Sequence, residues 1–592
     1  MLPSLYAANP RPALIKAALP EPVSEDARLL ASVKGQKLGT RLRAYLHLGG
    51  PGWLQSALTL GGASLTGSLY LGVLTGYSAL WLQPLAMLLG IIMLAALGYV
   101  TVSTGLSPFV AVKTYINPIL AWGWALASLI ASMVWALPQY ALANGVLQQN
   151  LLPGVLGPDS ALGERSSTVV VSVGILAVAT VIAWNYGSEK VGVRIYEVVL
   201  KVMVAAIVLA FMAVVLRLML VPPGLDVIAL LKGFVPDLRL ITRPAPGFDP
   251  LLVTLEPEAR AFWSRLIVSK QQDVMAAAFA SAVGINMTFL FGYSLLSRRW
   301  GREFRGFMKF DLATGMLIPF VLATSGIVVA ASSQFHAVPA PGFSQPVGAE
   351  TSAPPVSDRQ AAEYRTLLTE RLSIEGGAAP GSLDEAALDR RIDRMSSADR
   401  TMAAVLVNRV ASDLANALRP VSGEFFSHIV FGFGVLAMTV STITLMMVIS
   451  GMVVCELLGK PHSGWPFRLG SLLAATGALG PFFWSQAYFW LAVPTSIVGL
   501  MLLPIAYATF VLMMNRRSLL GDDMPIGWRR AAWNGLMLSS LAVVVATSLY
   551  MIRKQTGAIG FVVLVLFLAA VLGAEVYRWF RPTARAAAGN VF

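Results

Sequence analysis

The sequence predicts an all-α protein that crosses a lipid bilayer many times and is built from two inverted halves. Its 592 residues are 56% hydrophobic and only 13% charged, and its mean hydropathy is +0.68. Soluble domains carry about 25% charged residues, so this composition indicates a polytopic membrane protein. The inverted halves are indicated by two apolar segments, 53–75 and 275–297, each with small or polar residues at mid-length.

The net charge, the cysteine content and the motifs of the chain bear on which classes of protein it could belong to. The net charge of +13 does not require a nucleic-acid partner, because Lys and Arg collect in the cytoplasmic loops of membrane proteins. The single cysteine, Cys455, excludes an internal disulfide framework. No phosphate-binding loop, Cys/His metal cluster or nucleophile constellation stands in a supporting context. We therefore expect neither an enzyme nor a cofactor.

Apolar segments divide the chain into spans and loops. Since about 20 residues cross a bilayer, we expect about twelve spans. They lie at 53–75, 78–102, 118–147, 168–186, 194–221, 275–297, 309–333, 426–456, 467–484, 487–514, 530–552 and 557–580. The expected divisions are a tail at 1–50, helices 1–7 at 51–333 with an outer loop at 222–274, a helical outer loop at 334–425, helices 8–12 at 426–580 and a tail at 581–592.

Basic loops predict the orientation in the membrane. The connections at 298–309 and 516–530 are rich in Arg and Lys, and the C-terminal end carries Arg578, Arg581 and Arg585. With about twelve spans these segments fall on the same side as the N-terminus, and basic loops stay in the cytoplasm. We expect cytoplasmic termini in a plasma or inner membrane. The 334–425 loop then lies outside, where it could contact a partner protein.

The first span is interrupted at its centre. Gly61-Gly62-Ala63-Ser64 and then Thr66 stand where an ordinary membrane anchor would carry Leu or Val. Paired glycines weaken a helix, and freed backbone groups are costly in hydrocarbon unless they line a cavity or meet a ligand. Close packing against another helix is the alternative use of small residues.

The sixth span mirrors this feature. Gly284-Ile285-Asn286-Met287 stand at its middle, and it runs in the opposite direction to the first span. Interrupted helices in corresponding positions of two inverted halves are typical of secondary transporters, which bind substrate between the breaks. The pair therefore favours a substrate site over simple packing.

Several segments resemble the Nramp divalent-metal transporters. The resemblance rests on Gly50-Pro51-Gly52, Gly76–Trp81, Lys232–Pro236, Ser441–Thr444, Gly451, Glu456, Pro504 and Arg516-Arg517. It covers about residues 45–335 and 426–552. It implies a LeuT-type fold of five-plus-five inverted repeats with helices 1 and 6 interrupted, two further C-terminal spans, and transport of a divalent metal cation.

The chain departs from the Nramp pattern at the metal site. The family's Asp-Pro-Gly-Asn falls on Gly61 to Ser64, its Met-Pro-His on Ile285 to Met287, and its tenth-span Gln on Leu502. Transition metals prefer carboxylate, imidazole or sulfur ligands. A dehydrated dication without a counter-charge would be costly here, so manganese or iron binding in the family manner is doubtful and no residue is assigned as a metal ligand.

Three hypotheses remain open. The first is a secondary transporter that moves a small ion through this uncharged site. The second is a carrier of a small anion, zwitterion or neutral solute, favoured by the N-terminus of a helix that restarts after Gly62. The third is a sensor or scaffold without transport, favoured if Leu65, Ile285 and Leu502 fill the gap. The candidate substrate-binding residues are Gly61, Gly62, Ala63, Ser64, Thr66, Gly284, Ile285, Asn286, Met287, Ser441 and Thr442.

Overall fold

The computed structural model describes residues 25–580 except 158–159, 186–189, 221–223, 341, 344–355, 357, 377–384, 410–428, 430 and 484–490. The described elements are all helical. The predictions for residues 1–24 and 581–592, including Arg581 and Arg585, lie outside the described residues.

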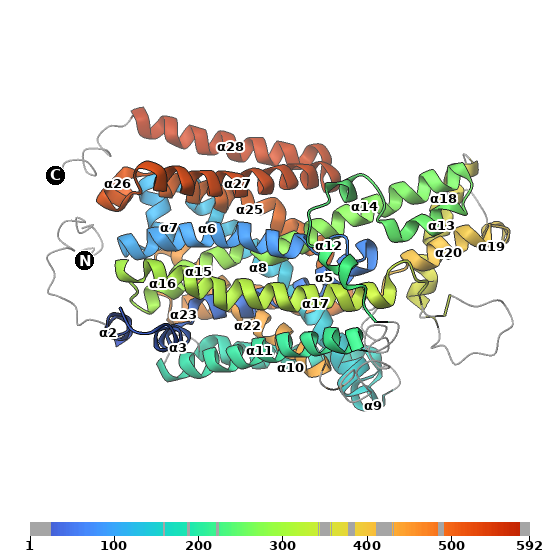
Figure 1. Ribbon diagram of the computed structural model, residues 1–592, viewed down its shortest axis with the longest axis horizontal. Coiled ribbons are helices and arrows are strands. Elements are labelled where there is room, and N and C mark those ends of the chain that lie inside the picture. The colour runs from blue at the N-terminus through green and yellow to red at the C-terminus, as the bar shows by residue number, and fades with distance from the viewer. Residues whose placement is uncertain are drawn as a thin grey trace, which may run out of the picture.

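The first half contains helices that run mostly along the long axis of the molecule (Figure 1). Their bounds are α2 Glu25–Ser32, α3 Leu38–Leu48, α4 Pro51–Thr59, α5 Gly62–Thr75, α6 Leu82–Thr104, α7 Pro108–Ala111, α8 Pro118–Val146, α9 Pro153–Leu156, α10 Gly163–Asn185, α11 Lys190–Leu220, α12 Val227–Lys232, α13 Asp249–Val253, α14 Pro257–Ala282, α15 Ile285–Ser297, α16 Arg305–Leu312 and α17 Ile318–Phe335.

The second half adds an outer helical group and completes the bundle. Its helices are α18 Asp358–Gly376, α19 Glu385–Asp393, α20 Ser397–Leu406, α22 Phe431–Leu458, α23 Gly464–Ser471, α24 Gly480–Phe483, α25 Ala492–Met514, α26 Arg517–Leu520, α27 Gly527–Gln555 and α28 Gly557–Phe580. Helices α18 to α20 lie beyond one end of the bundle, and α2, α3 and the end of α28 lie at the other (Figure 1).

The predicted spans are present. Among the described residues, nine helices are long and apolar enough to cross a membrane, and the bent pair α4 and α5 makes a tenth. The other two predicted spans correspond to α11 and to the segment formed by α23, a 3-10 helix at Leu472–Leu479, and α24. The prediction of a polytopic, all-helical membrane protein is confirmed.

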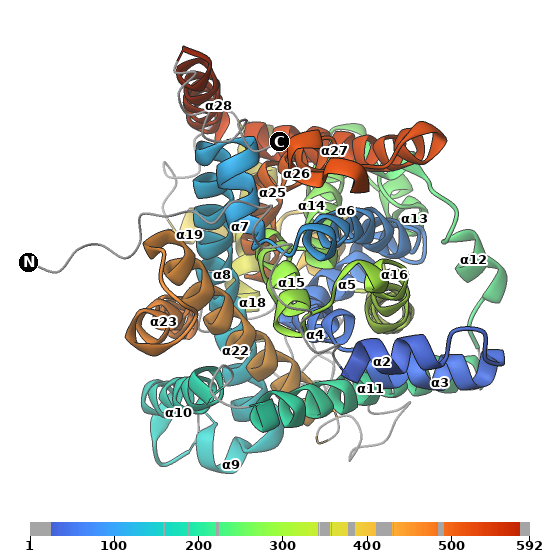
Figure 2. The ribbon, with the colours of Figure 1, turned by 90° about the vertical axis from the view of Figure 1, so that its left-hand side faces the viewer.

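Helix α28 has the exposed apolar surface that is typical of a helix in contact with lipid. It is highly apolar, yet no residue in it is buried by the protein, and it lies at the edge of the bundle (Figures 1 and 2). Val563, Leu566 and Leu572, for example, are each more than 60% exposed. A stretch of 24 residues with this composition is long enough to span hydrocarbon, and lipid tails would cover its exposed surface.

Local sequence signals set several helix starts. Pro51 and Pro118 occupy the first turns of α4 and α8, where a missing N–H removes no helical hydrogen bond. Asn117 caps α8 by accepting hydrogen bonds from the N–H groups of Ile119 (2.8 Å) and Leu120 (3.2 Å). Helix α14 begins at Pro257, inside the expected outer loop at 222–274, and continues into the sixth predicted span.

The outer helices are attached to the bundle through α14. The Nε1–H of Trp263 donates to Oδ1 of Asp399 at 2.7 Å, and Trp263 is fully buried. Asp399 also lies 3.5 Å from the guanidinium of Arg371 on α18. This contact places the outer group against the same helix that leads to the sixth-span break.

Candidate functional site

The first break lies between α4 and α5 and is sharp. Helix α4 ends at Thr59, α5 begins at Gly62, and the two are bent by 55°. Gly61 between them is extended, with φ −111° and ψ −174°. The N–H of Gly62, freed by the break, donates to Oε1 of Gln139 on α8 at 2.9 Å. The predicted interruption of the first span is confirmed.

The second break lies between α14 and α15. Helix α14 ends at Ala282 and α15 begins at Ile285, with Gly284 extended at φ −83° and ψ 157°. The helices on either side form a single span, Pro257–Ser297, rather than a strongly bent pair. The predicted interruption of the sixth span is therefore confirmed as a local break that bends the helix less sharply than the first break.

The side chain of Met287 joins the two breaks. Its Sδ accepts the hydroxyl of Thr59, at the end of α4, at 3.4 Å and the backbone N–H of Gly284 at 3.3 Å. The Thr59 hydroxyl also lies 3.4 Å from the carbonyl oxygen of Ala282, the last residue of α14. All these residues are buried. The breaks, more than 200 residues apart in sequence, thus meet in the middle of the bundle, where α4, α5 and α15 lie in Figure 2.

Neighbouring side chains occupy the space beside the glycines of the breaks. A Cβ on Gly61 would lie 2.5 Å from Oγ1 of Thr442, and a Cβ on Gly284 would lie 2.2 Å from the Trp135 ring. A Cβ on Gly62 would lie 2.2 Å from a methyl group of Leu142. Real Cβ atoms do not approach so closely, so side chains from α8 and α22 close the site in this conformation.

Polar groups around the breaks are neutral. The Asn286 amide lies 3.4 Å from Oγ of Ser132, and its Oδ1 accepts the N–H of Met287 at 2.9 Å. The Nε2 of Gln139 is buried without a hydrogen-bond partner. Within the described part of the chain, no group of three His, Cys, Asp or Glu side chains could hold a metal ion.

Gln55 is a further residue of this region that the sequence reasoning missed. It is fully buried on α4, and neither its amide oxygen nor its amide nitrogen has a hydrogen-bond partner. Unpaired buried polar groups are rare and call for an explanation such as an ordered water or a ligand. Gln55 precedes Thr59 by four residues, so both lie on one helix face. That spacing within an apolar segment is the signal that could have identified the pair.

The structure brings together some of the predicted site residues and separates others. Gly61, Gly62, Gly284, Met287 and Thr442 meet at the breaks, as the contacts above show. The Ser64 hydroxyl donates locally to Gly61 O (2.9 Å), and the Ser441 and Thr442 hydroxyls donate to Met438 O on their own helix. Ala63 is half-buried, and Thr66 is buried with an unpartnered hydroxyl. Of the three residues expected to fill a closed gap, Leu65 and Ile285 are fully buried and Leu502 is half-buried.

Asp311 is the buried carboxylate nearest the start of α4. A carboxylate at the start of the seventh predicted span would ordinarily cap its own helix, but Asp311 does not. Its Oδ1 and Oδ2 accept the N–H groups of Gly50 (3.1 Å) and Gly52 (2.6 Å), so it caps α4 instead. Arg298 and Lys201 donate to the carbonyl oxygens of Leu48 and Gly49 beside it. The side chain of Glu197, four residues before Lys201, lies outside the described residues.

Comparisons with known proteins agree with this architecture. The model of the family described as natural resistance-associated macrophage protein-like (Nramp) matches residues 397–554. The manganese transporter of Eremococcus coleocola, solved with an aromatic bis-isothiourea substituted compound, is similar in structure, with a TM-score of 0.58 and 14% identity over 92% of this chain and 96% of that chain.

The structures of two variants of that transporter are also similar to this chain. One with a histidine-to-alanine substitution has a TM-score of 0.55 and 13% identity, and covers 91% of this chain and 95% of its own. One with a glutamate-to-glutamine substitution has a TM-score of 0.53 and 14% identity over the same shares. No curated protein sequence matches this chain. At these identities the structural likeness establishes the fold, which is the LeuT-type fold expected from the sequence.

Proposed function

We propose that this chain, whose residues 397–554 match the Nramp family model, is a secondary transporter that moves a small ion through an uncharged site between the two helix breaks. The observation that supports this most is the meeting of the breaks at Met287, whose sulfur contacts Thr59 from one half and Gly284 from the other. A substrate held there would contact both inverted halves, which is the position transporters of this architecture use.

The ligand groups available suit an ion that needs no carboxylate. A thioether, amides, hydroxyls and backbone carbonyls are all neutral, and a fully dehydrated dication would meet no counter-charge among them. A cation that keeps part of its water shell, as Mg²⁺ does, needs fewer direct protein ligands. The amide oxygen of Gln55, which is buried without a partner, is the group we assign to accept hydrogen bonds from the water shell of such an ion.

A second candidate is a small anion or zwitterion. It is favoured by the unpartnered Nε2 of Gln139, which can donate to an anionic oxygen beside the N-terminus of α5. The Gly62 N–H already donates to the other atom of the same amide, so an anion would compete with Gln139 Oε1 for that donor.

Uptake by the protein reconstituted in liposomes tests these proposals. We expect accumulation of Mg²⁺ above the level in protein-free liposomes. Uptake of labelled α-amino acids or phosphate instead would support the second candidate. The absence of uptake for every probe, with folded protein in the membrane, would contradict the transporter proposal and favour the sensor or scaffold.

A glycine at the break provides the matched variant for this assay. We expect Gly284→Ala to slow uptake by about tenfold or more, because its Cβ would overlap the Trp135 ring and overpacking costs about 1–3 kcal/mol. Gly174→Ala in α10, whose Cβ would meet nothing within 4 Å, is the control and should leave uptake unchanged. Equal uptake by the two variants would show that the second break is not part of the transport path.

A further inference from the structure

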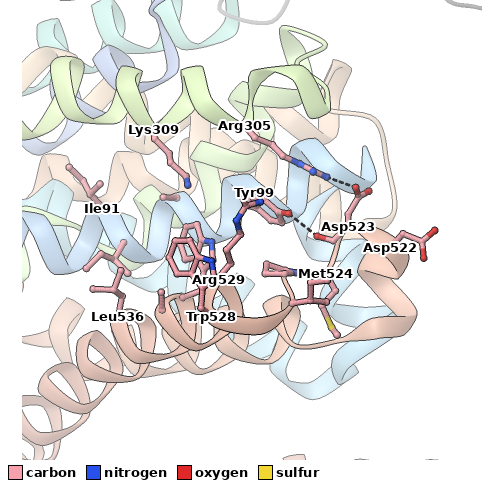
Figure 3. Close-up of a pocket in the computed structure, with 16 residues that line it drawn as sticks. Ile91, Tyr99, Arg305, Lys309, Asp522, Asp523, Met524, Trp528, Arg529 and Leu536 are labelled. Carbon is pink, nitrogen blue, oxygen red and sulfur yellow. Dashed lines mark hydrogen bonds and ion pairs between the residues drawn. The ribbon is translucent and has the colours of Figure 1, made fainter.

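A cavity lies at the end of the bundle that carries α2 and α3. Its volume is about 720 Å³, and it lies between α6, α16 and the segment that joins α26 to α27 (Figure 3). One side is apolar, with Ile91, Ile92 and Leu536. The other side is polar and basic. Neither the helix breaks nor the site between them contributes a residue to this cavity.

Two basic side chains of this cavity form no ion pair with its acidic residues. Asp523 forms ion pairs with Arg302 at 2.7 Å and with Arg305 at 2.9 Å. Asp522 also lines the cavity, but its carboxylate is turned away from Lys309 and Arg529 (Figure 3). Lys309 lies over the ring of Trp533, 4.8 Å from its centre, and no ion pair links it or Arg529 to an acidic group in the described residues.

Lys309 and Arg529 extend toward the middle of the cavity from opposite walls, Lys309 from α16 and Arg529 from the first turn of α27 (Figure 3). The start of α27 adds to the positive potential. Its N-cap position, Ile526, provides no side-chain hydrogen bond, so the first N–H groups of a 29-residue helix remain open. These N–H groups carry the positive end of the helix dipole, which favours a negative group beside Arg529.

The rim of the cavity has the character of a membrane interface. Ile526 is 78% exposed and Trp528 is 77% exposed, and both line the cavity. Large apolar side chains in this position would be unfavourable in bulk water, whereas Trp is enriched at the level of lipid headgroups. Ile91 and Ile92 on α6 and Leu536 on α27 form the apolar wall of the cavity.

We propose that this cavity binds an anionic phospholipid. Lys309, Arg529 and the N-terminus of α27 hold the head-group phosphate, and Ile91, Ile92 and Leu536 contact the first carbons of an acyl chain. Basic pockets between membrane helices are suited to anionic head groups. The apolar wall and the exposed Trp528 favour a lipid over free phosphate. Free phosphate shares the head group's chemistry but cannot make apolar contacts with this wall.

Native mass spectrometry of the full chain, purified from mixed vesicles of phosphatidylglycerol and phosphatidylcholine, tests this proposal. We expect the natural protein to retain phosphatidylglycerol preferentially. We expect a Lys309→Gln, Arg529→Gln double variant to retain about tenfold less of it, since each basic group near a membrane surface contributes to the attraction of anionic lipid. The charge-conserving Lys309→Arg, Arg529→Lys variant should restore retention, which shows that the loss does not come from misfolding.

Arg530→Gln is the matched control. It removes the same charge from the adjacent position of α27, which does not line the cavity, and should leave retention unchanged. Equal retention of phosphatidylglycerol by the natural chain and the Gln double variant would overturn the proposal. Displacement of the lipid by millimolar inorganic phosphate would also overturn it, because the site would then recognise the phosphate alone.

Discussion

Manganese binding should appear in a Gly61→Asp, Thr442→Ala double variant and be weaker by about tenfold or more in the natural chain. The substitution at Gly61 supplies the carboxylate that the resembled family carries at this position. The substitution at Thr442 is needed because its Oγ1 lies only 2.5 Å from where the new Cβ would be. The new carboxylate is the type of ligand that Mn²⁺ prefers, and the thioether of Met287, already placed between the breaks, would be a second, softer ligand.

Isothermal calorimetry on the purified variants measures this effect. The matched control is Gly61→Asn, Thr442→Ala, which has the same size and no charge and should not gain affinity. The single Gly61→Asp variant should lose stability because its side chain overlaps Thr442. Micromolar binding of Mn²⁺ by the natural chain would contradict this prediction, because ligands other than those at the breaks would then replace the missing carboxylate.

Removal of the Asp311 carboxylate should destabilise the protein strongly. In Asp311→Ala the N–H groups of Gly50 and Gly52 lose their acceptors, and the positive charges of Arg298 and Lys201 lose the buried carboxylate beside them. Breaking a buried charge network by removing one partner costs about 3–5 kcal/mol. The loss should show as a lower midpoint of thermal unfolding in detergent.

Asp522→Ala is the control for this experiment, because Asp522 is an exposed aspartate at the same end of the bundle. Its unfolding midpoint should match that of the natural chain. If Asp311→Ala melted at the same temperature as Asp522→Ala, the carboxylate would have no role in holding α4. A transport defect in a partly stable variant such as Asp311→Asn would further indicate that the attachment of α4 to α16 matters for the transport cycle.

The two helix breaks could be predicted from the sequence because their cause is local. Glycines at 61, 62 and 284 weaken the helices in which they stand, whatever lies around them. The residues that face those glycines could not be predicted in the same way. Thr442 lies about 380 positions from Gly61 along the chain, and Trp135 about 150 positions from Gly284, so only the packing of the bundle brings them together.

The same distinction applies to Asp311. An acidic residue near the start of a helix is typical of a local cap, and the sequence alone offered no competing partner. The carboxylate instead accepts hydrogen bonds from residues about 260 positions earlier, at the start of another helix. Gln55 was missed for a related reason, because a single amide in an apolar segment becomes notable only when both its polar atoms are found buried without partners.

Thiol labelling tests most directly whether the breaks line a transport path, and it needs no knowledge of the substrate. The chain has one cysteine, the buried Cys455, so a Cys455→Ala background is free of thiols. In that background Thr59→Cys lies between the breaks, and Ala96→Cys, fully buried in α6, is the control. In liposomes, a small hydrophilic methanethiosulfonate should modify Thr59→Cys and leave Ala96→Cys unmodified. Protection of both thiols from reagent on either side of the membrane would contradict a transport path through the breaks.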